Sequence, residues 1–168
     1  VIDMLLKRQL IPPLSIHTSD GRTVRAWDFK QKKSLVIVFL DANCALCRDF
    51  LLLLAARAQA IIEKNAVALI VFLETPSAFL IDALPPGIIA GADVSGRSAR
   101  SFLEDAAVGH HGSARTGVFV TDRYGELFDQ WQSSRHEFPP FSEVLSTLHQ
   151  IEIACEECTY PSLLPPEE

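Results

Sequence analysis

Two continuous apolar runs dominate the pattern of hydrophobic and polar positions along the chain. Ser34–Leu40 and Val67–Leu73 are short, uninterrupted and rich in β-branched residues, which is typical of buried strands. The segment between them, from about Cys44 to Lys64, is long enough for a helix and carries apolar residues on most sides. Continuous apolar strands joined by a helix favour a parallel βαβ unit covered on both faces.

Two predicted β-hairpins flank this unit. Leu14–His17 and Thr23–Arg25 alternate in polarity around a short polar turn. Near the other end of the chain, Val118–Thr121 and Glu126–Trp131 flank a turn that ends in Gly125, where positive φ is needed. The second hairpin should close the sheet as an antiparallel pair.

The remaining elements alternate in a way that fits an α/β fold. The pattern predicts one helical turn over 26–29, helices over 76–83, 95–105 and 142–154, and a short strand over 88–90. The predicted fold is a central mixed sheet flanked by helices, with an N-terminal β-hairpin. We divide the chain into an N-terminal extension (1–10), one α/β domain (11–154) and a C-terminal tail (155–168).

The sequence Cys44-Ala45-Leu46-Cys47 follows the first apolar strand and opens the predicted helix. This position puts the Cys44 sulfur at a helix N-terminus, where free N–H groups and the helix dipole favour a thiolate. A thiolate attacks disulfides, and a cysteine one turn further on resolves the mixed disulfide. The pattern therefore favours thiol–disulfide exchange, with Cys44 as the exposed nucleophile and Cys47 as the shielded resolving thiol. A zinc site and an inert pair of buried cysteines stay open as alternatives.

A second pair, Cys155 and Cys158, lies beyond the predicted final helix, beside Glu156 and Glu157. Three roles are open for it: a second redox pair that exchanges with Cys44 and Cys47, half of a metal site, or a local disulfide without a role. We favour the redox pair, because a mobile dithiol can reach a fixed one.

Composition narrows the classes of partner. The 168 residues carry a net charge of −6, which argues against a nucleic-acid partner. No apolar run approaches the roughly 20 residues needed to span a membrane. No secretory signal is visible, and four cysteines are too few for a disulfide-dense secreted scaffold. We therefore expect a cytoplasmic protein; the oligomeric state is open.

Several segments together resemble the thioredoxin-like redoxin family, in its alkyl hydroperoxide reductase and thiol-specific antioxidant branch. They are the segment Ile11-Pro12-Pro13-Leu14, the hairpin Ser19–Val24, the active-site segment Val38–Cys47 and the late strand and turn Gly117–Gly125. The end of the chain, Ile151–Cys158, is similar to a tail found on some bacterial redoxins. The resemblance implies a thioredoxin-like fold and a redox or antioxidant role, with a protein or small-molecule disulfide as substrate and a reductase as electron donor. It implies no cofactor and no metal.

The resemblance also points to residues that support the cysteines. The position of the family's cis-proline falls near Thr116, where this chain has no proline, and the preceding loop, with His110 and Arg115, should lie opposite the active cysteine. His110 could favour the thiolate, and Arg115 could hold an anion. Asp41 could accept the proton of Cys47 as a general base. For each of these residues an ordinary surface or packing role is the competing interpretation.

Departures from the family pattern favour a dithiol exchanger over a peroxidase. Peroxidatic redoxins place a proline and a Thr or Ser seven and three residues before their cysteine, but Ile37 and Asp41 occupy those positions before Cys44. We therefore expect weak or absent peroxidase activity. The alternative is a non-catalytic redoxin-fold module whose cysteine pairs bind zinc or serve only structure.

Overall fold

The computed structural model describes residues 5–74, 84–93, 95–103 and 116–159, with side chains as far as Ala154. The strands are β1 (Ser15–His17), β2 (Thr23–Arg25), β3 (Ser34–Leu40), β4 (Ala66–Phe72), β5 (Ile88–Ala92), β6 (Thr116–Thr121) and β7 (Leu127–Ser133). The helices are η1 (Ala26–Phe29), α1 (Ala45–Ala56), α2 (Ala58–Glu63), α4 (Arg97–Phe102) and α5 (Phe141–Thr159). The helix predicted over 76–83 lies outside the described residues.

The described strands form one mixed sheet in the order β2-β1-β5-β4-β3-β6-β7. β3 and β4 are adjacent and parallel, from Ser34 opposite Ala66 to Leu40 opposite Phe72, which confirms the predicted βαβ unit. β6 runs antiparallel to β3 and β7 antiparallel to β6. The end of β3, the start of β6 and the end of β7 therefore meet at one edge of the sheet.

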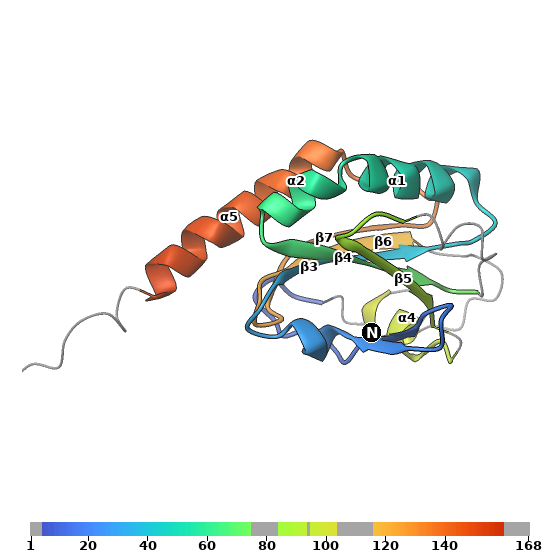
Figure 1. Ribbon diagram of the computed structural model, residues 1–168, viewed down its shortest axis with the longest axis horizontal. Helices are drawn as coiled ribbons and strands as arrows, with labels where there is room; N and C mark the ends of the chain where they lie inside the picture. The colour runs from blue at the N-terminus through green and yellow to red at the C-terminus, as the bar shows by residue number, and fades with distance from the viewer. Residues whose placement is uncertain (1–4, 75–83, 94, 104–115, 160–168) are drawn as a thin grey trace, which may run out of the picture.

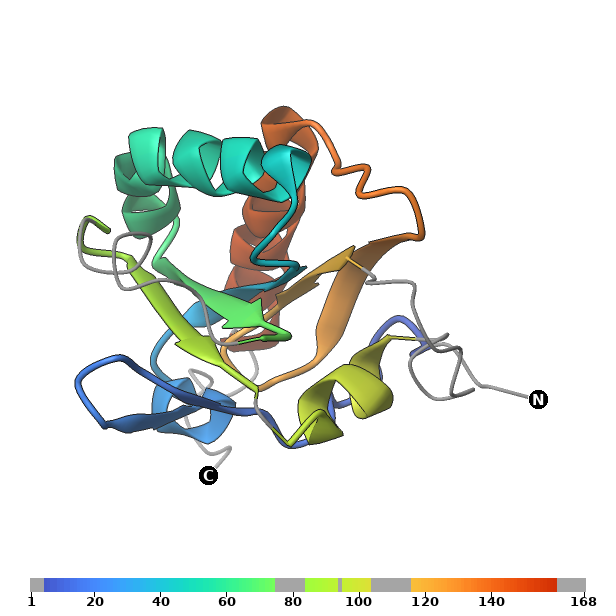
Figure 2. The same cartoon turned by 90° about the vertical axis from the view of Figure 1, so that its right-hand side faces the viewer.

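Both faces of the sheet are covered, as the apolar character of the central strands requires (Figure 1). Helices α1, α2 and α5 pack on one face over Val36, Val38 and Ile70. The other face lies under the N-terminal hairpin, η1 and α4, as the turned view shows (Figure 2). All residues of β3 and β4 are buried, because they contribute to both cores.

Two local predictions differ from the structure. The long helix is interrupted at Arg57, which ends α1 and begins α2. The helix predicted to begin at residue 95 begins at Arg97, and its N-cap is Gly96, in the left-handed region. Trp27, in η1, is 71% exposed, and the Lys30 ammonium lies 4.1 Å from its ring centroid.

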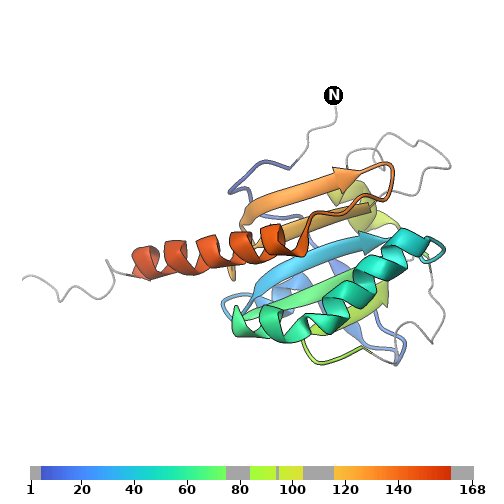
Figure 3. The same ribbon diagram turned by 90° about the horizontal axis from the view of Figure 1, so that it is seen from above.

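The last helix is longer than predicted. α5 continues to Thr159 instead of ending near Ala154, so its backbone includes the positions of Cys155 and Cys158. Its last turns project from the body of the molecule (Figure 3). No described helix is both long enough and apolar enough to cross a membrane.

Candidate redox site

Cys44 occupies the N-cap of α1, as the strand-to-helix junction predicts. Its backbone is extended, with φ −101° and ψ 126°, and its carbonyl accepts the first helical hydrogen bond from the Arg48 N–H. The Cys47 N–H donates to the Cys44 Sγ at 3.3 Å. This N–H is one of the free donors of the first helical turn, and it favours negative charge on the sulfur.

Cys47 lies one turn further along α1, on the side that faces the sheet. Its side chain is 1% exposed, whereas Cys44 is partly exposed. Burial raises the pKa of the Cys47 thiol from 9.0 to about 12. The sulfur of Cys44 and the negative charge of Asp41 add to this rise, and the backbone of Asp41 partly offsets it. Both cysteines are free thiols, and only Cys44 is open to a substrate.

Asp41 shapes the loop between β3 and α1. Its carboxylate accepts a hydrogen bond from the Asn43 N–H at 3.0 Å, and its carbonyl accepts one from the Cys44 N–H at 3.4 Å. The Asn43 amide also donates to Glu74 at 3.3 Å, which ties this loop to the end of β4. The structure therefore brings Asp41, a predicted supporting residue, into the site beside both cysteines.

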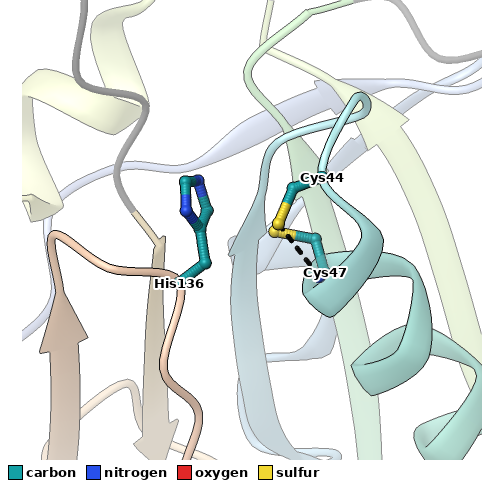
Figure 4. A group of neighbouring side chains, drawn as sticks. All are labelled: Cys44, Cys47 and His136. Atoms are coloured by element: carbon teal, nitrogen blue, oxygen red, sulfur yellow. Dashed lines mark hydrogen bonds between the residues drawn. The ribbon is translucent and has the colours of Figure 1, made fainter.

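His136 completes the site, and sequence reasoning missed it. One ring nitrogen of His136 and the two sulfurs all lie within 4.8 Å of one another. Figure 4 shows the imidazole facing the two sulfurs from the loop that follows β7. Its Nε2 atom is buried, 3.8 Å from Asp41 Oδ2, and has no hydrogen-bond partner among the described residues. The predicted second hairpin could have indicated His136, because the second strand of that hairpin ends at the edge of the sheet where β3 ends.

The loop that carries His136 is held at both ends. The Ser133 hydroxyl accepts hydrogen bonds from the N–H groups of Arg135 and Glu137, at 3.0 and 3.1 Å. Phe138 stacks on Phe50 of α1, with ring centroids 4.3 Å apart and planes 7° apart. His136 itself has φ +58°, an uncommon value for a residue other than glycine. These contacts hold the imidazole against the first turn of α1.

The other predicted supporting residues are only partly described. Thr116 is buried at the start of β6, and its hydroxyl donates to the Ser133 carbonyl at 3.5 Å. Phe39 pairs with Gly117, so Thr116 lies at the sheet edge where β3 ends. Its supporting role stays a prediction. Arg115 and His110 lie outside the described residues.

The second cysteine pair lies at the opposite end of the molecule from the first. Lys64 and Glu152 form an ion pair at 3.1 Å, which places the end of α2 beside α5 just before Cys155. The helical segment from Cys44 to Lys64 spans roughly 30 Å at 1.5 Å per residue. Figures 1 and 3 show the start of α1 and the end of α5 at opposite ends of the molecule. The backbone therefore does not gather four cysteines into one zinc site within a chain.

A pocket of about 830 Å³ lies away from the cysteines. The first hairpin, η1, the start of α4 and the turn after β6 line it, and Asp41, Cys44, Cys47 and His136 do not. The candidate chemistry therefore lies outside this pocket, at the edge of the sheet where β3 ends.

Comparison with solved structures identifies the architecture. No protein-family model and no curated protein sequence matches the chain. A Chlorobium tepidum protein assigned as thiol:disulfide interchange protein DsbE aligns over 89% of this chain and 97% of its own, with 19% identity and a TM-score of 0.62. The chain has a thioredoxin-like fold. A reduced 2-Cys peroxiredoxin from Plasmodium vivax aligns over 89% of this chain and 98% of its own, with 15% identity and a TM-score of 0.71. A yeast mitochondrial 1-Cys peroxiredoxin covers 92% of this chain and 79% of its own, at 16% identity and a TM-score of 0.73.

Proposed function

We propose that the protein is a thiol–disulfide oxidoreductase with Cys44 as nucleophile and Cys47 as resolving thiol. The observation that carries the proposal is the pair's geometry: a partly exposed cysteine accepts a hydrogen bond from the first helical turn, and a buried cysteine supplies that donor. The thioredoxin-like fold supports it, because one neighbour of the same fold is assigned as a thiol:disulfide interchange protein.

The reaction follows from the positions of the two sulfurs. The Cys44 thiolate attacks one sulfur of a substrate disulfide, forms a mixed disulfide and releases the other sulfur as a thiol after protonation. Cys47 then loses its proton and attacks the Cys44 sulfur, which releases the second substrate thiol and leaves a Cys44–Cys47 disulfide. Two electrons pass to the substrate, and an electron-donating reductase restores the dithiol.

The second step needs a base, because the pKa of Cys47 lies at about 12. Asp41 and His136 both face the pair, and their oxygen and nitrogen atoms are 3.8 Å apart. Either group can accept the Cys47 proton as the sulfur attacks. The site thus contains a nucleophile, a resolving thiol and a proton acceptor.

Trapping tests the assignment directly. A Cys47→Ser variant should accumulate a mixed disulfide with a model disulfide protein such as insulin, and its turnover should fall at least about 100-fold. A Cys44→Ser variant, the matched control, should form no such adduct. A stable adduct through Cys47 instead of Cys44, or undiminished turnover in Cys44→Ser, would show the assignment to be wrong.

A peroxidase is the competing activity, since two of the neighbours described above are peroxiredoxins. Peroxide cleavage develops negative charge that needs donors and a cation. Next to Cys44 the described residues provide one backbone N–H donor, from Cys47, and the imidazole of His136. The carboxylate of Asp41 lies beside that imidazole and opposes the developing negative charge. We expect the reduced protein to consume hydrogen peroxide no faster than a free thiol. Fast consumption that disappears in Cys44→Ser would favour the peroxidase.

An antioxidant role in the cytoplasm is part of the same proposal. A reducing compartment keeps the pair as the dithiol, which is the form that attacks substrate disulfides. Reduction of the pair by a cell's thioredoxin or glutathione system, measured in extract, tests this placement.

A further inference from the structure

A three-residue group at the site has the donor atoms of a metal centre. Two sulfurs and one imidazole nitrogen lie within 4.8 Å of one another, from Cys44, Cys47 and His136. Ligand atoms that share one ion, at bonds of about 2.3 Å to sulfur and about 2.0 Å to nitrogen, lie roughly 3.5–4 Å apart. An inward shift of about 1 Å or less therefore brings all three onto one ion.

The three ligands come from elements that are already fixed. Cys44 and Cys47 belong to the first turn of α1, and the stack of Phe138 on Phe50 holds the His136 loop against that helix. The buried Nε2 atom of His136 has no hydrogen-bond partner among the described residues, which costs free energy unless another group satisfies it. Asp41 Oδ2 lies 3.8 Å from the same Nε2 atom, so a carboxylate also stands beside the three donor atoms.

We propose that the reduced protein binds one thiophilic cation with a filled d shell, copper(I) or zinc(II), through Cys44, Cys47 and His136. Two thiolates and an imidazole suit both ions. Three protein ligands complete trigonal copper(I), and they leave a fourth position for water on zinc(II). This ligand set differs from the four-cysteine site considered from sequence.

Metal binding and disulfide exchange exclude each other on the same sulfurs. The metal binding itself does not depend on the proposed function. Only the release of the ion by disulfide exchange rests on it. A substrate disulfide that takes two electrons from the pair closes the Cys44–Cys47 bond and gains two protons as two thiols. The closed disulfide has no thiolate left, so the ion is released.

The test uses the full chain as a Cys155→Ser/Cys158→Ser variant, so that only one cysteine pair remains. Reduced, metal-free protein is titrated anaerobically with copper(I) against a chromophoric chelator, and separately with zinc(II) against a metal indicator. We expect one ion per chain with one or both metals. Adding His136→Ala should weaken binding at least about tenfold, since even second-shell partners of a ligand contribute 10–100-fold. Adding His149→Ala, an exposed histidine of α5, should change nothing.

X-ray absorption spectroscopy of the metal-bound Cys155→Ser/Cys158→Ser protein, which retains His136, identifies the ligand atoms directly. This measurement does not depend on whether the His136→Ala variant folds. Two sulfur ligands and one nitrogen support the proposal. Two-sulfur coordination without nitrogen, equal affinity in His136→Ala, or no stoichiometric binding of either metal would overturn it. Reduction of insulin by the same metal-free protein separates the hypotheses: exchange without metal binding defeats this inference alone, and metal binding without exchange defeats the proposed function alone.

Discussion

At the scale of single residues, the two cysteines differ in exposure, and burial raises the pKa of Cys47. Cys44 is partly exposed, whereas Cys47 is 1% exposed with a pKa of about 12. Iodoacetamide at pH ~8 should therefore modify Cys44 at least about tenfold faster than Cys47, because thiolates react and thiols do not. Peptide mass mapping of the reduced protein measures the two rates. Faster labelling of Cys47 would reverse the assignment of nucleophile and resolving thiol.

The same pKa predicts how stability depends on pH. In the unfolded chain Cys47 loses its proton near 9.0, and in the folded chain only near 12. Between these values the folded state holds more protons, so the free energy of unfolding falls as pH rises, by up to about 1.4 kcal/mol per pH unit. Urea unfolding of reduced, metal-free protein measures this slope. A Cys47→Ala variant is the control, and a slope equal to its slope would contradict the prediction.

Sequence reasoning found the cysteines but not the histidine that faces them. Cys44 and Cys47 are recognisable because their spacing and their position after a strand are local properties. His136 depends on the register of β6 with β7 and on the stack of Phe138 on Phe50, both long-range contacts. A single histidine in a polar loop carries no local sign of such contacts.

At the scale of elements, the Phe50–Phe138 stack joins the last loop to the helix that carries the cysteines. Phe138→Ala should lower the free energy of unfolding by about 1–3 kcal/mol, from lost apolar burial and ring stacking. Denaturant unfolding measures the loss. Phe138→Leu, which retains apolar volume, should cost less, and equal losses would show that the stack itself contributes little.

Close packing of β5 against β1 gives a second test at this scale. A Cβ at Gly91 would lie 2.7 Å from the His17 carbonyl oxygen, so Gly91→Ala must shift the β1 backbone. We expect a loss of about 1–3 kcal/mol in the free energy of unfolding. Gly21→Ala is the control: no atom lies within 4 Å there, and only the φ of +85° opposes the substitution, at about 1 kcal/mol. If Gly91→Ala lowers the free energy of unfolding less than Gly21→Ala does, the β1 backbone can move away from β5 at little cost.

The sequence-based predictions of strands are confirmed where the hydrophobic pattern is continuous. β3 and β4 match within a residue, because strands buried on both faces have uninterrupted apolar sequences. The break at Arg57 was missed, since apolar residues continue on both sides of it. The end of α5 was missed because Cys155–Thr159 contains no glycine or proline to stop a helix.

At the scale of the whole molecule, α5 separates the two cysteine pairs. The ion pair between Lys64 and Glu152 fixes that helix at the far end of α2, roughly 30 Å from Cys44 along the helical segment. Electron relay from Cys155 and Cys158 to Cys44 within one chain therefore needs a large movement of α5, or a second molecule. The relay expected from sequence, in which a mobile tail reaches the site, stays a prediction that requires one of these two conditions.

Oxidation of dilute protein should therefore close each pair separately. Non-reducing peptide mapping of the monomer should find the Cys44–Cys47 disulfide and no bond from either of these residues to Cys155 or Cys158. Exchange between the pairs, if it occurs, should rise with protein concentration, because it requires two chains to meet. A Cys155→Ser/Cys158→Ser variant should then reduce a disulfide substrate at the wild-type rate in dilute solution. A cross-pair disulfide that forms in the monomer independently of concentration would instead establish a relay within the chain, and it would require α5 to leave the position that Lys64 and Glu152 define.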